Sequence, residues 1–180
     1  MIIYAMRHGQ TDWNTQSRIQ GKTDIPLNET GRMQARAIAE SLPDGITVIL
    51  SSPLKRAIET AEIVNERFGV PIVIEEALIE RNFGGYEGQL MSDVDFNALR
   101  SWWSDTPTPG GETIREVCDR VFGFASAIEE KYSGQTVLIV THGHVLCAMD
   151  WYWDGLPQRG GQSIPEMENC AVREFVVREG

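Results

Sequence analysis

Short apolar runs alternate with longer amphipathic stretches along the chain. Residues 2–6, 46–50, 71–74 and 136–140 are apolar, β-branched runs of strand length. Runs with so few polar positions are typical of strands buried on both faces of a sheet. We expect a further, edge-like strand over 170–177.

Between these runs, apolar residues recur every three or four positions, as in helices with one buried face. Asn28 is placed to cap the first such helix and Pro43 to end it, while Ser52 and Pro53 are predicted to be the cap and first residue of the second. The predicted helices are 29–42, 53–68, 92–103, 112–132 and 143–153. This alternation predicts an α/β protein, a three-layer α/β/α sandwich around a mostly parallel sheet.

Length and charge narrow the possible classes of protein. The chain has 180 residues, with 16 Lys+Arg against 26 Asp+Glu and a formal net charge of −10. One domain over 1–180 is expected from this length. A nucleic-acid binder needs a surplus of Lys and Arg, and so does a protein attracted to anionic lipid, so we expect neither partner.

The spacing of the cysteines and the length of the apolar runs indicate the cellular compartment of the protein. Cys118, Cys147 and Cys170 are widely separated and form no CxxC pair, which indicates reduced thiols. The apolar N-terminal run ends at Arg7, too early for a signal peptide, and no run approaches the length of a membrane span. We expect a soluble, cytoplasmic protein that is a monomer or a homodimer.

Polar clusters follow three of the predicted strands. These clusters are 7–9, 51–56 and 141–144. Ligands of open α/β sheets bind beyond the carboxyl ends of the strands, so His8, His142 and two arginines are expected to meet in one crevice. Arginine beside histidine in a crevice is typical of a bound oxyanion. Arg56 has an alternative, a surface ion pair with Glu59, but a cation in a first helical turn opposes the helix dipole unless an anion binds there.

The polar clusters belong to an ordered series of motifs. The series resembles the histidine phosphatase superfamily, the phosphoglycerate-mutase-like proteins, from residue 3 to about 150. Each element is weak alone, but their order is specific. The elements are Arg7-His8-Gly9-Gln10-Thr11, Asn14, Gln20-Gly21, Pro26-Leu27, Gly31, Ser51-Ser52-Pro53-Leu54, Arg56, Thr60-Ala61, Glu80-Arg81, Gly84, Glu87-Gly88, Gly110-Gly111-Glu112 and Thr141-His142-Gly143.

The resemblance implies a mechanism and a role for each matching residue. His8 is the expected nucleophile, which attacks phosphorus to form a phosphohistidine. Glu80 is the expected proton donor, with a pKa raised by neighbouring phosphate and carboxylate charges. The expected phosphoryl ligands are Arg7, Arg56 and His142, with further phosphate contacts from Asn14 and Gly143, and substrate contacts from Gln20 and Gly21.

Two alternatives concern individual residues. From its sequence neighbours alone, Glu80 would be read as a solvated loop carboxylate beside Glu75 and Glu76; the family motif reverses that interpretation. His142, His144 and His8 could form a zinc site, but no Asp or Cys lies at a matching spacing and the chain is expected to turn at residue 143. We therefore expect no metal and no cofactor.

The superfamily contains both phosphatases and mutases. The resemblance implies that members with mutase activity are longer chains, with a larger insertion after the glutamate that donates the proton and a C-terminal tail that closes the site. Here only about 30 residues (110 − 80) separate Glu80 from Gly110, and Gln20-Gly21 is similar to the phosphatase pattern. We expect a phosphomonoesterase acting on a small phosphorylated metabolite. A phosphoglycerate mutase-type isomerase and a non-catalytic phosphate-binding module are the alternatives.

Overall fold

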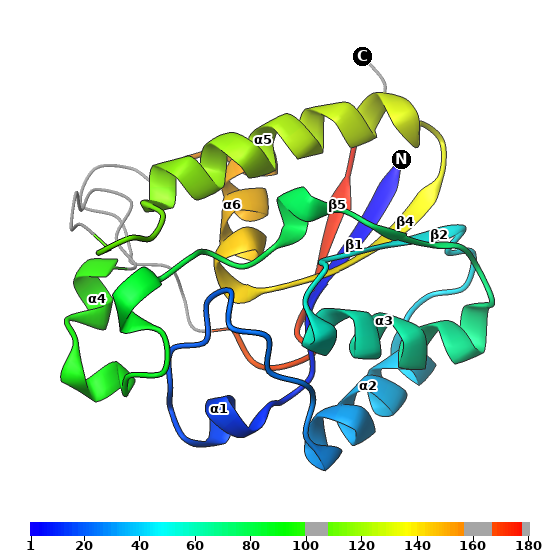
Figure 1. Ribbon diagram of the computed structural model, residues 1–180. Helices are drawn as coiled ribbons and strands as arrows, with labels where there is room; N and C mark the ends of the chain where they lie inside the picture. The colour runs from blue at the N-terminus through cyan, green and yellow to red at the C-terminus, as the bar shows by residue number, and fades with distance from the viewer. Residues whose placement is uncertain (100–107, 157–166, 178–180) are drawn as a thin grey trace.

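The structure, a computed structural model, describes residues 1–99, 108–156 and 167–177. Five strands form one sheet in the order β3-β2-β4-β1-β5 (Figure 1). All neighbouring strands are parallel except β5, which pairs antiparallel with β1. The strands are β1 (Ile2–Arg7), β2 (Val48–Ser51), β3 (Ile72–Ile74), β4 (Thr136–Thr141) and β5 (Val172–Val176).

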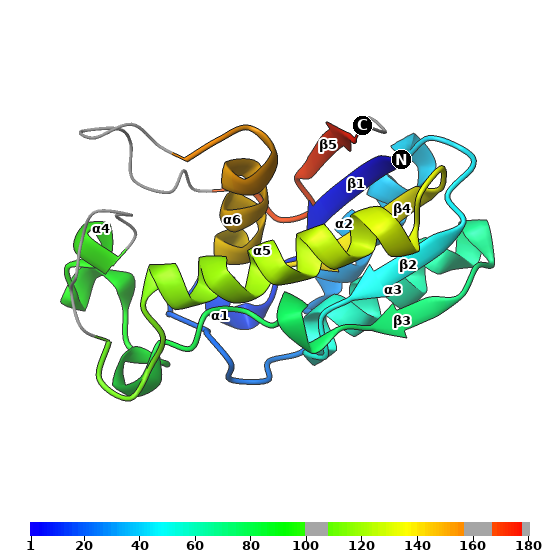
Figure 2. The same ribbon diagram turned by 90° about the horizontal axis from the view of Figure 1, so that it is seen from above.

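Helices cover both faces of this sheet. Figures 1 and 2 show α2 and α3 on one face and α5 with α6 on the other. The α-helices are α1 (Asp12–Thr15), α2 (Glu29–Ser41), α3 (Lys55–Phe68), α4 (Phe96–Leu99), α5 (Ile114–Lys131) and α6 (Gly143–Trp153). Three short 3₁₀ helices lie between β3 and α4, namely η1 (Glu76–Leu78), η2 (Gly84–Tyr86) and η3 (Met91–Asp93). The predicted three-layer α/β fold with a mostly parallel sheet is confirmed.

The sheet separates two apolar clusters. Along β4, Val137 and Ile139 point into the cluster under α5 and α6, while Leu138 and Val140 point into the cluster under α2 and α3. All four side chains are fully buried. The absence of polar alternation in this run thus follows from burial on both faces. No helix among the described residues has the length and apolar character needed to cross a membrane.

Two sequence expectations about helices need correction. α3 begins at Lys55 with Leu54 as N-cap, so the predicted cap at Ser52 is wrong. The hydroxyl of Ser52 forms a hydrogen bond with His142 instead. The loop after β1 also contains α1, which was not predicted because four residues are too few to show a helical period. Only α4 and part of η3 occupy the predicted helix 92–103. Residues 94 and 95 form a turn, and 100–103 lie outside the described residues.

Candidate active site

The carboxyl ends of β1, β2 and β4 meet at the centre of the sheet. His8 follows β1 and its amide donates to the Thr141 carbonyl of β4 at 2.9 Å, while the Ser52 amide donates to Val140 at 3.0 Å. The rings of His8 and His142 lie 5.1 Å apart, centre to centre. The structure therefore brings together the histidines that the sequence separates by more than a hundred residues.

His8 is held in one tautomer by its own loop. Its side chain is buried, and Nδ1 lies 2.7 Å from the Gly9 carbonyl oxygen. A carbonyl only accepts hydrogen bonds, so Nδ1 carries the proton and Nε2 keeps its lone pair. Burial, followed by the charges of Arg56 and Arg7, lowers the pKa of His8 well below its usual value. The imidazole is therefore neutral at physiological pH, as a nucleophile must be.

Close backbone packing anchors this nucleophile loop. The Gly9 amide donates to the Thr60 hydroxyl of α3 at 3.0 Å. A Cβ atom added to Gly9 would lie 2.5 Å from the Gly31 carbonyl oxygen of α2. No side chain fits at such a distance, so glycine at position 9 lets the loop rest directly on α2.

His142 is the second buried histidine of the site. Its Nε2 lies 2.7 Å from the Ser52 hydroxyl, and its Nδ1 has no hydrogen-bond partner among the described residues. Burial is the main reason that its pKa lies well below the ordinary value, with Arg56 and His8 adding to the effect. A neutral His142 whose Nε2 accepts from Ser52 has a proton on Nδ1 for a ligand.

Arg56 is almost completely buried in the first turn of α3. Its Nη1 donates to the Thr23 carbonyl at 2.9 Å and its Nη2 to the Gly21 carbonyl at 2.7 Å. Burial lowers its pKa to about 10, so the guanidinium stays charged at neutral pH. The alternative ion pair with Glu59 is wrong, since that carboxylate lies 3.4 Å from Arg32 instead. The Nε of Arg56 has no partner among the described residues.

Arg7 ends β1 and contacts a segment that sequence reasoning missed. Its guanidinium donates to the Met167 carbonyl, and the Cys170 amide donates to the Arg7 carbonyl at 3.1 Å. Asn169 donates from its amide group to the His8 carbonyl at 3.1 Å. Nothing in the sequence marks residues 167–170 as part of the site, because they approach it only through the pairing of β5 with β1.

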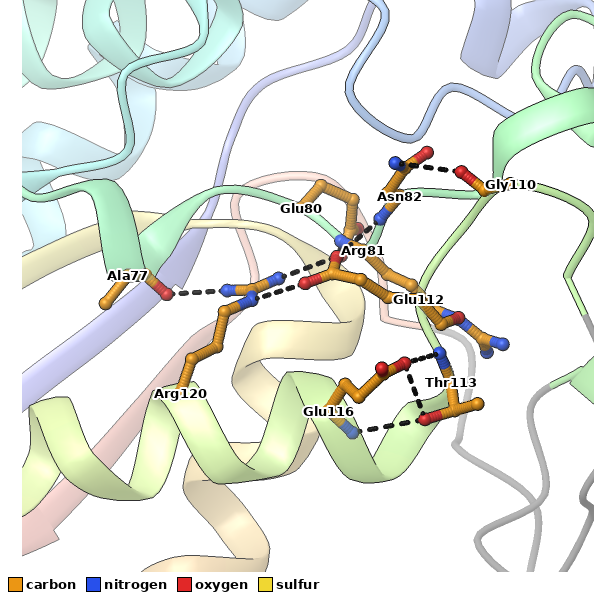
Figure 3. A network of polar contacts seen from close by, with 9 residues as sticks. All are labelled: Ala77, Glu80, Arg81, Asn82, Gly110, Glu112, Thr113, Glu116 and Arg120. Carbon is orange, nitrogen blue, oxygen red and sulfur yellow. Dashed lines mark hydrogen bonds and ion pairs between the residues drawn. The ribbon is translucent and has the colours of Figure 1, made fainter.

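Glu80 lies between η1 and η2, on a segment without regular structure (Figure 3). Its side chain is buried; Oε1 accepts from the Arg81 amide at 2.9 Å and lies 3.9 Å from His144 Nδ1. The solvated-carboxylate alternative is therefore wrong. Burial raises the pKa of Glu80 although Arg56 and Arg7 lower it. The expected direction is confirmed, but desolvation causes it, not neighbouring negative charge.

The side chains of Arg120, in α5, and Glu112, just before α5, support the backbone on both sides of Glu80 (Figure 3). Arg120 donates to the Ala77 carbonyl at 2.6 Å and pairs with Glu112 at 3.0 Å. Glu112 in turn accepts from the Asn82 amide at 2.7 Å. A lone arginine on the polar side of a helix has no distinguishing sequence signal, so this support was not predicted.

The remaining predicted residues lie around the same crevice. Asn14 and Arg7 line a cavity of about 580 Å³, together with Gln34 of α2 and the 167–169 segment; the lining does not include His8 or His142. Gln20 accepts from the Thr11 hydroxyl at 3.0 Å, and Gly21 binds Arg56 through its carbonyl. Gly143 opens α6 with open space beside its Cα. Substrate contact by these four predicted residues, Asn14, Gln20, Gly21 and Gly143, stays a prediction.

A structural or catalytic metal ion needs at least three protein ligands grouped in one place. Within residues 1–99, 108–156 and 167–177, no three His, Cys, Asp or Glu side chains are grouped so as to hold a metal ion. The polar groups of the crevice are instead neutral imidazoles, guanidinium groups and one protonatable carboxyl. This combination suits the binding and transfer of a phosphoryl group.

Comparison with known sequences agrees with this chemistry. Residues 3–180 match the family model of the histidine phosphatase superfamily (branch 1). An uncharacterized phosphatase, PhoE, from Bacillus subtilis is 42% identical over 148 residues, which are 82% of this chain and 74% of PhoE. Phosphoglycerate mutase-like protein 4 of Arabidopsis thaliana is 35% identical over 99% of this chain and 80% of its own length.

Solved structures extend the similarity to the fold. YhfR of Bacillus stearothermophilus has a TM-score of 0.85 at 33% identity and covers 99% of this chain and 92% of its own. A mycobacterial glucosyl-3-phosphoglycerate phosphatase with VO3 has a TM-score of 0.81 at 28% identity, covering 96% and 91%. The phosphatases among these proteins confirm the predicted enzyme class, a phosphatase. With the family model matched over nearly its whole length, the chain belongs to the histidine phosphatase superfamily, branch 1.

Proposed function

We propose that this protein is a phosphomonoesterase that hydrolyses a small phosphorylated metabolite through a phosphohistidine on His8. The observation that supports this most directly is the hydrogen bond from His8 Nδ1 to the Gly9 carbonyl. That bond leaves the lone pair on Nε2, and the guanidinium groups of Arg56 and Arg7 are close enough to act on this imidazole. An attack on phosphorus needs this combination.

In the first step, His8 Nε2 forms a bond to phosphorus as the bond to the ester oxygen breaks. Arg7, Arg56 and the Nδ1–H of His142 bind the phosphoryl oxygens and stabilise their developing charge. Glu80 gives its proton to the leaving alkoxide. Its raised pKa keeps more of the carboxyl protonated for this step than an exposed glutamate would have.

In the second step, the Glu80 carboxylate takes a proton from an attacking water. The water oxygen bonds to phosphorus, the nitrogen–phosphorus bond breaks, and its electron pair returns to Nε2. Inorganic phosphate leaves, with His8 neutral and Glu80 protonated again. No charge has to be stored on His8 between turnovers, which agrees with its lowered pKa.

The charge of the chain supports a small substrate. The cavity of about 580 Å³ adjoins the site at Arg7 and has the size of a metabolite pocket, but His8 does not line it, so it gives less support. The net charge of −10 is screened beyond about 8 Å at physiological salt, so a small anion can reach a positive pocket, whereas a polyanion is repelled. The relative that is a glucosyl-3-phosphoglycerate phosphatase also favours a phosphorylated metabolite.

The name of one relative supports a second candidate, transfer of the phosphoryl group between hydroxyls. This relative is the Arabidopsis phosphoglycerate mutase-like protein 4. A mutase must keep water from its phosphoenzyme. Isomer formation that depends on a bisphosphorylated primer, with little phosphate release, would favour it.

The deciding experiment measures phosphate release from sugar phosphates, phosphoglycerates, nucleotides and p-nitrophenyl phosphate, with and without a chelator. We expect release without a primer and unchanged by the chelator. We expect the intact mass of the quenched wild-type enzyme to show one bound phosphate, which is acid-labile and base-stable. The His8→Ala variant should show none. Release that stops with chelation, or no phosphate on His8 during turnover, would overturn the proposal.

A further inference from the structure

The carboxylate of Glu87, just after η2, joins two segments of the active site. It accepts hydrogen bonds from the backbone amides of Lys22 and Thr23, both at 2.9 Å, and from the Phe83 amide at 3.1 Å. The Thr23 hydroxyl donates to it as well. One half-buried carboxylate thus binds four donors, and three of these lie in the loop that starts at Gly21.

The opposite side of the same loop holds the Arg56 guanidinium. The carbonyl groups of Gly21 and Thr23 accept its two Nη hydrogen bonds, at 2.7 and 2.9 Å. The loop therefore presents its amides to Glu87 and its carbonyls to Arg56. Since Arg56 is buried and has these carbonyls as its hydrogen-bond acceptors among the described residues, the loop sets the direction of its remaining donors.

Gly21 shows how closely the carboxylate approaches. Its φ is +55°, and a Cβ atom there would lie 2.0 Å from Glu87 Oε1. Only glycine tolerates both the backbone conformation and the contact. The loop and the carboxylate therefore fit as one unit, which explains a glycine at this position without any contact to substrate.

We propose that Glu87 is a positioning residue that fixes the Gly21–Thr23 loop and thereby orients Arg56 toward the phosphoryl group. Through the Phe83 amide, Glu87 also connects this loop to the Glu80 segment. The proposal rests on the proposed phosphoryl-binding role of Arg56. It assigns Glu87 no contact with substrate. The negative charge of Glu87 also favours the charged form of Arg56.

The test uses inorganic phosphate as the probe and calorimetric binding as the readout, in addition to turnover of p-nitrophenyl phosphate. Glu87→Gln replaces acceptor oxygen by an NH₂ group facing backbone amides, so the loop must shift. We expect about 10-fold weaker phosphate binding and a similar loss in kcat/KM. The matched control, Glu62→Gln on the exposed side of α3, is expected to match wild type.

A double-mutant cycle separates positioning from general stabilisation. In an Arg56→Lys background, which lacks the guanidinium fork, Glu87→Gln is expected to change phosphate binding by less than about 2-fold. Equal, additive effects in both backgrounds would overturn the proposal, as would unchanged phosphate binding in Glu87→Gln. Should that variant not fold, Glu87→Asp replaces it in the same cycle with the same criteria.

The two proposals can fail separately. If wild type binds phosphate but hydrolyses no phosphomonoester, the proposed catalytic function fails, while the cycle measured by binding still decides the role of Glu87. If hydrolysis proceeds and the cycle is additive, Glu87 is no positioning residue and the phosphatase proposal stands.

Discussion

The two halves of the active site are supported in different ways. His8 and His142 directly follow β1 and β4, so the hydrogen bonds of the central sheet fix their backbone. Glu80 lies between two 3₁₀ helices, and side chains from another part of the chain hold its flanks. In the phosphoryl-binding half, backbone hydrogen bonds thus place the two histidines, and Arg56 depends on the loop that Glu87 holds. In the acid half, side-chain contacts hold the Glu80 segment.

This difference makes the Glu80 segment more sensitive than the two histidines to single substitutions far from the substrate. A ladder of backbone hydrogen bonds survives the loss of one side chain, but a segment held by one arginine and one glutamate does not. Substitutions in α5 should therefore impair protonation of the leaving group and spare the attack by His8. The following predictions test this separation.

Removal of the nucleophile is expected to have the largest effect. His8→Ala should lower kcat by at least about 10³-fold on every phosphomonoester, whatever its leaving group, because no phosphohistidine forms. Steady-state phosphate release measures this, with circular dichroism as the control for folding. Activity near wild type would contradict the mechanism.

Glu80→Gln should impair the acid half alone, so its effect on the rate should depend on how much the leaving group needs a proton. For an alkyl phosphate we expect a loss of about 10²- to 10³-fold in kcat, since the alkoxide needs a proton. For p-nitrophenyl phosphate the loss should be much smaller in the first step, measured as the burst of nitrophenol. An equal loss for both substrates would argue against Glu80 as the acid.

The pH profile gives the same separation in wild type. The acid step needs protonated Glu80, so kcat/KM for an alkyl phosphate should fall as pH rises through the raised pKa of Glu80. It should fall on the acid side only where His8 becomes protonated, well below pH 6.5. Glu80→Gln should remove the alkaline fall and leave the acidic one.

Arg120→Gln is expected to have an intermediate effect restricted to the acid half. Losing its bonds to Ala77 and Glu112 should loosen the Glu80 segment and lower kcat on an alkyl phosphate about 10-fold. Arg120 is also a cation that lowers the pKa of Glu80, so the alkaline fall should move to higher pH. Arg36→Gln, on the exposed side of α2, is the matched control. An unshifted pH profile would indicate a structural role only.

Ser52→Ala should have the smallest effect, in the phosphoryl-binding half. The hydroxyl orients His142 by one hydrogen bond of 2.7 Å, while the strand end still fixes the backbone. We expect a loss of about 3- to 10-fold in kcat/KM, similar for alkyl and aryl phosphates. A loss confined to the alkyl ester would place Ser52 with the acid half and contradict the comparison.

The phosphoryl-binding half was largely predictable from sequence, and the support of the acid half was not. Apolar runs that end in Arg7-His8 and Thr141-His142 predict strands whose ends carry polar side chains, and parallel strands bring such ends together. Glu80 was identified only by its family motif. Its burial, and the roles of Glu112 and Arg120, depend on contacts across 30 or more residues (112 − 82, for example) that leave no local pattern.

The sequence by itself determined the fold class, the family and the residues with the required chemistry, because burial patterns and motif order are properties of the chain alone. The tertiary structure decided their protonation and direction. Desolvation keeps His8 neutral and raises the pKa of Glu80, and the Gly9 carbonyl selects the reactive nitrogen. These effects come from what surrounds a group in space, and residues distant in sequence supply most of those surroundings.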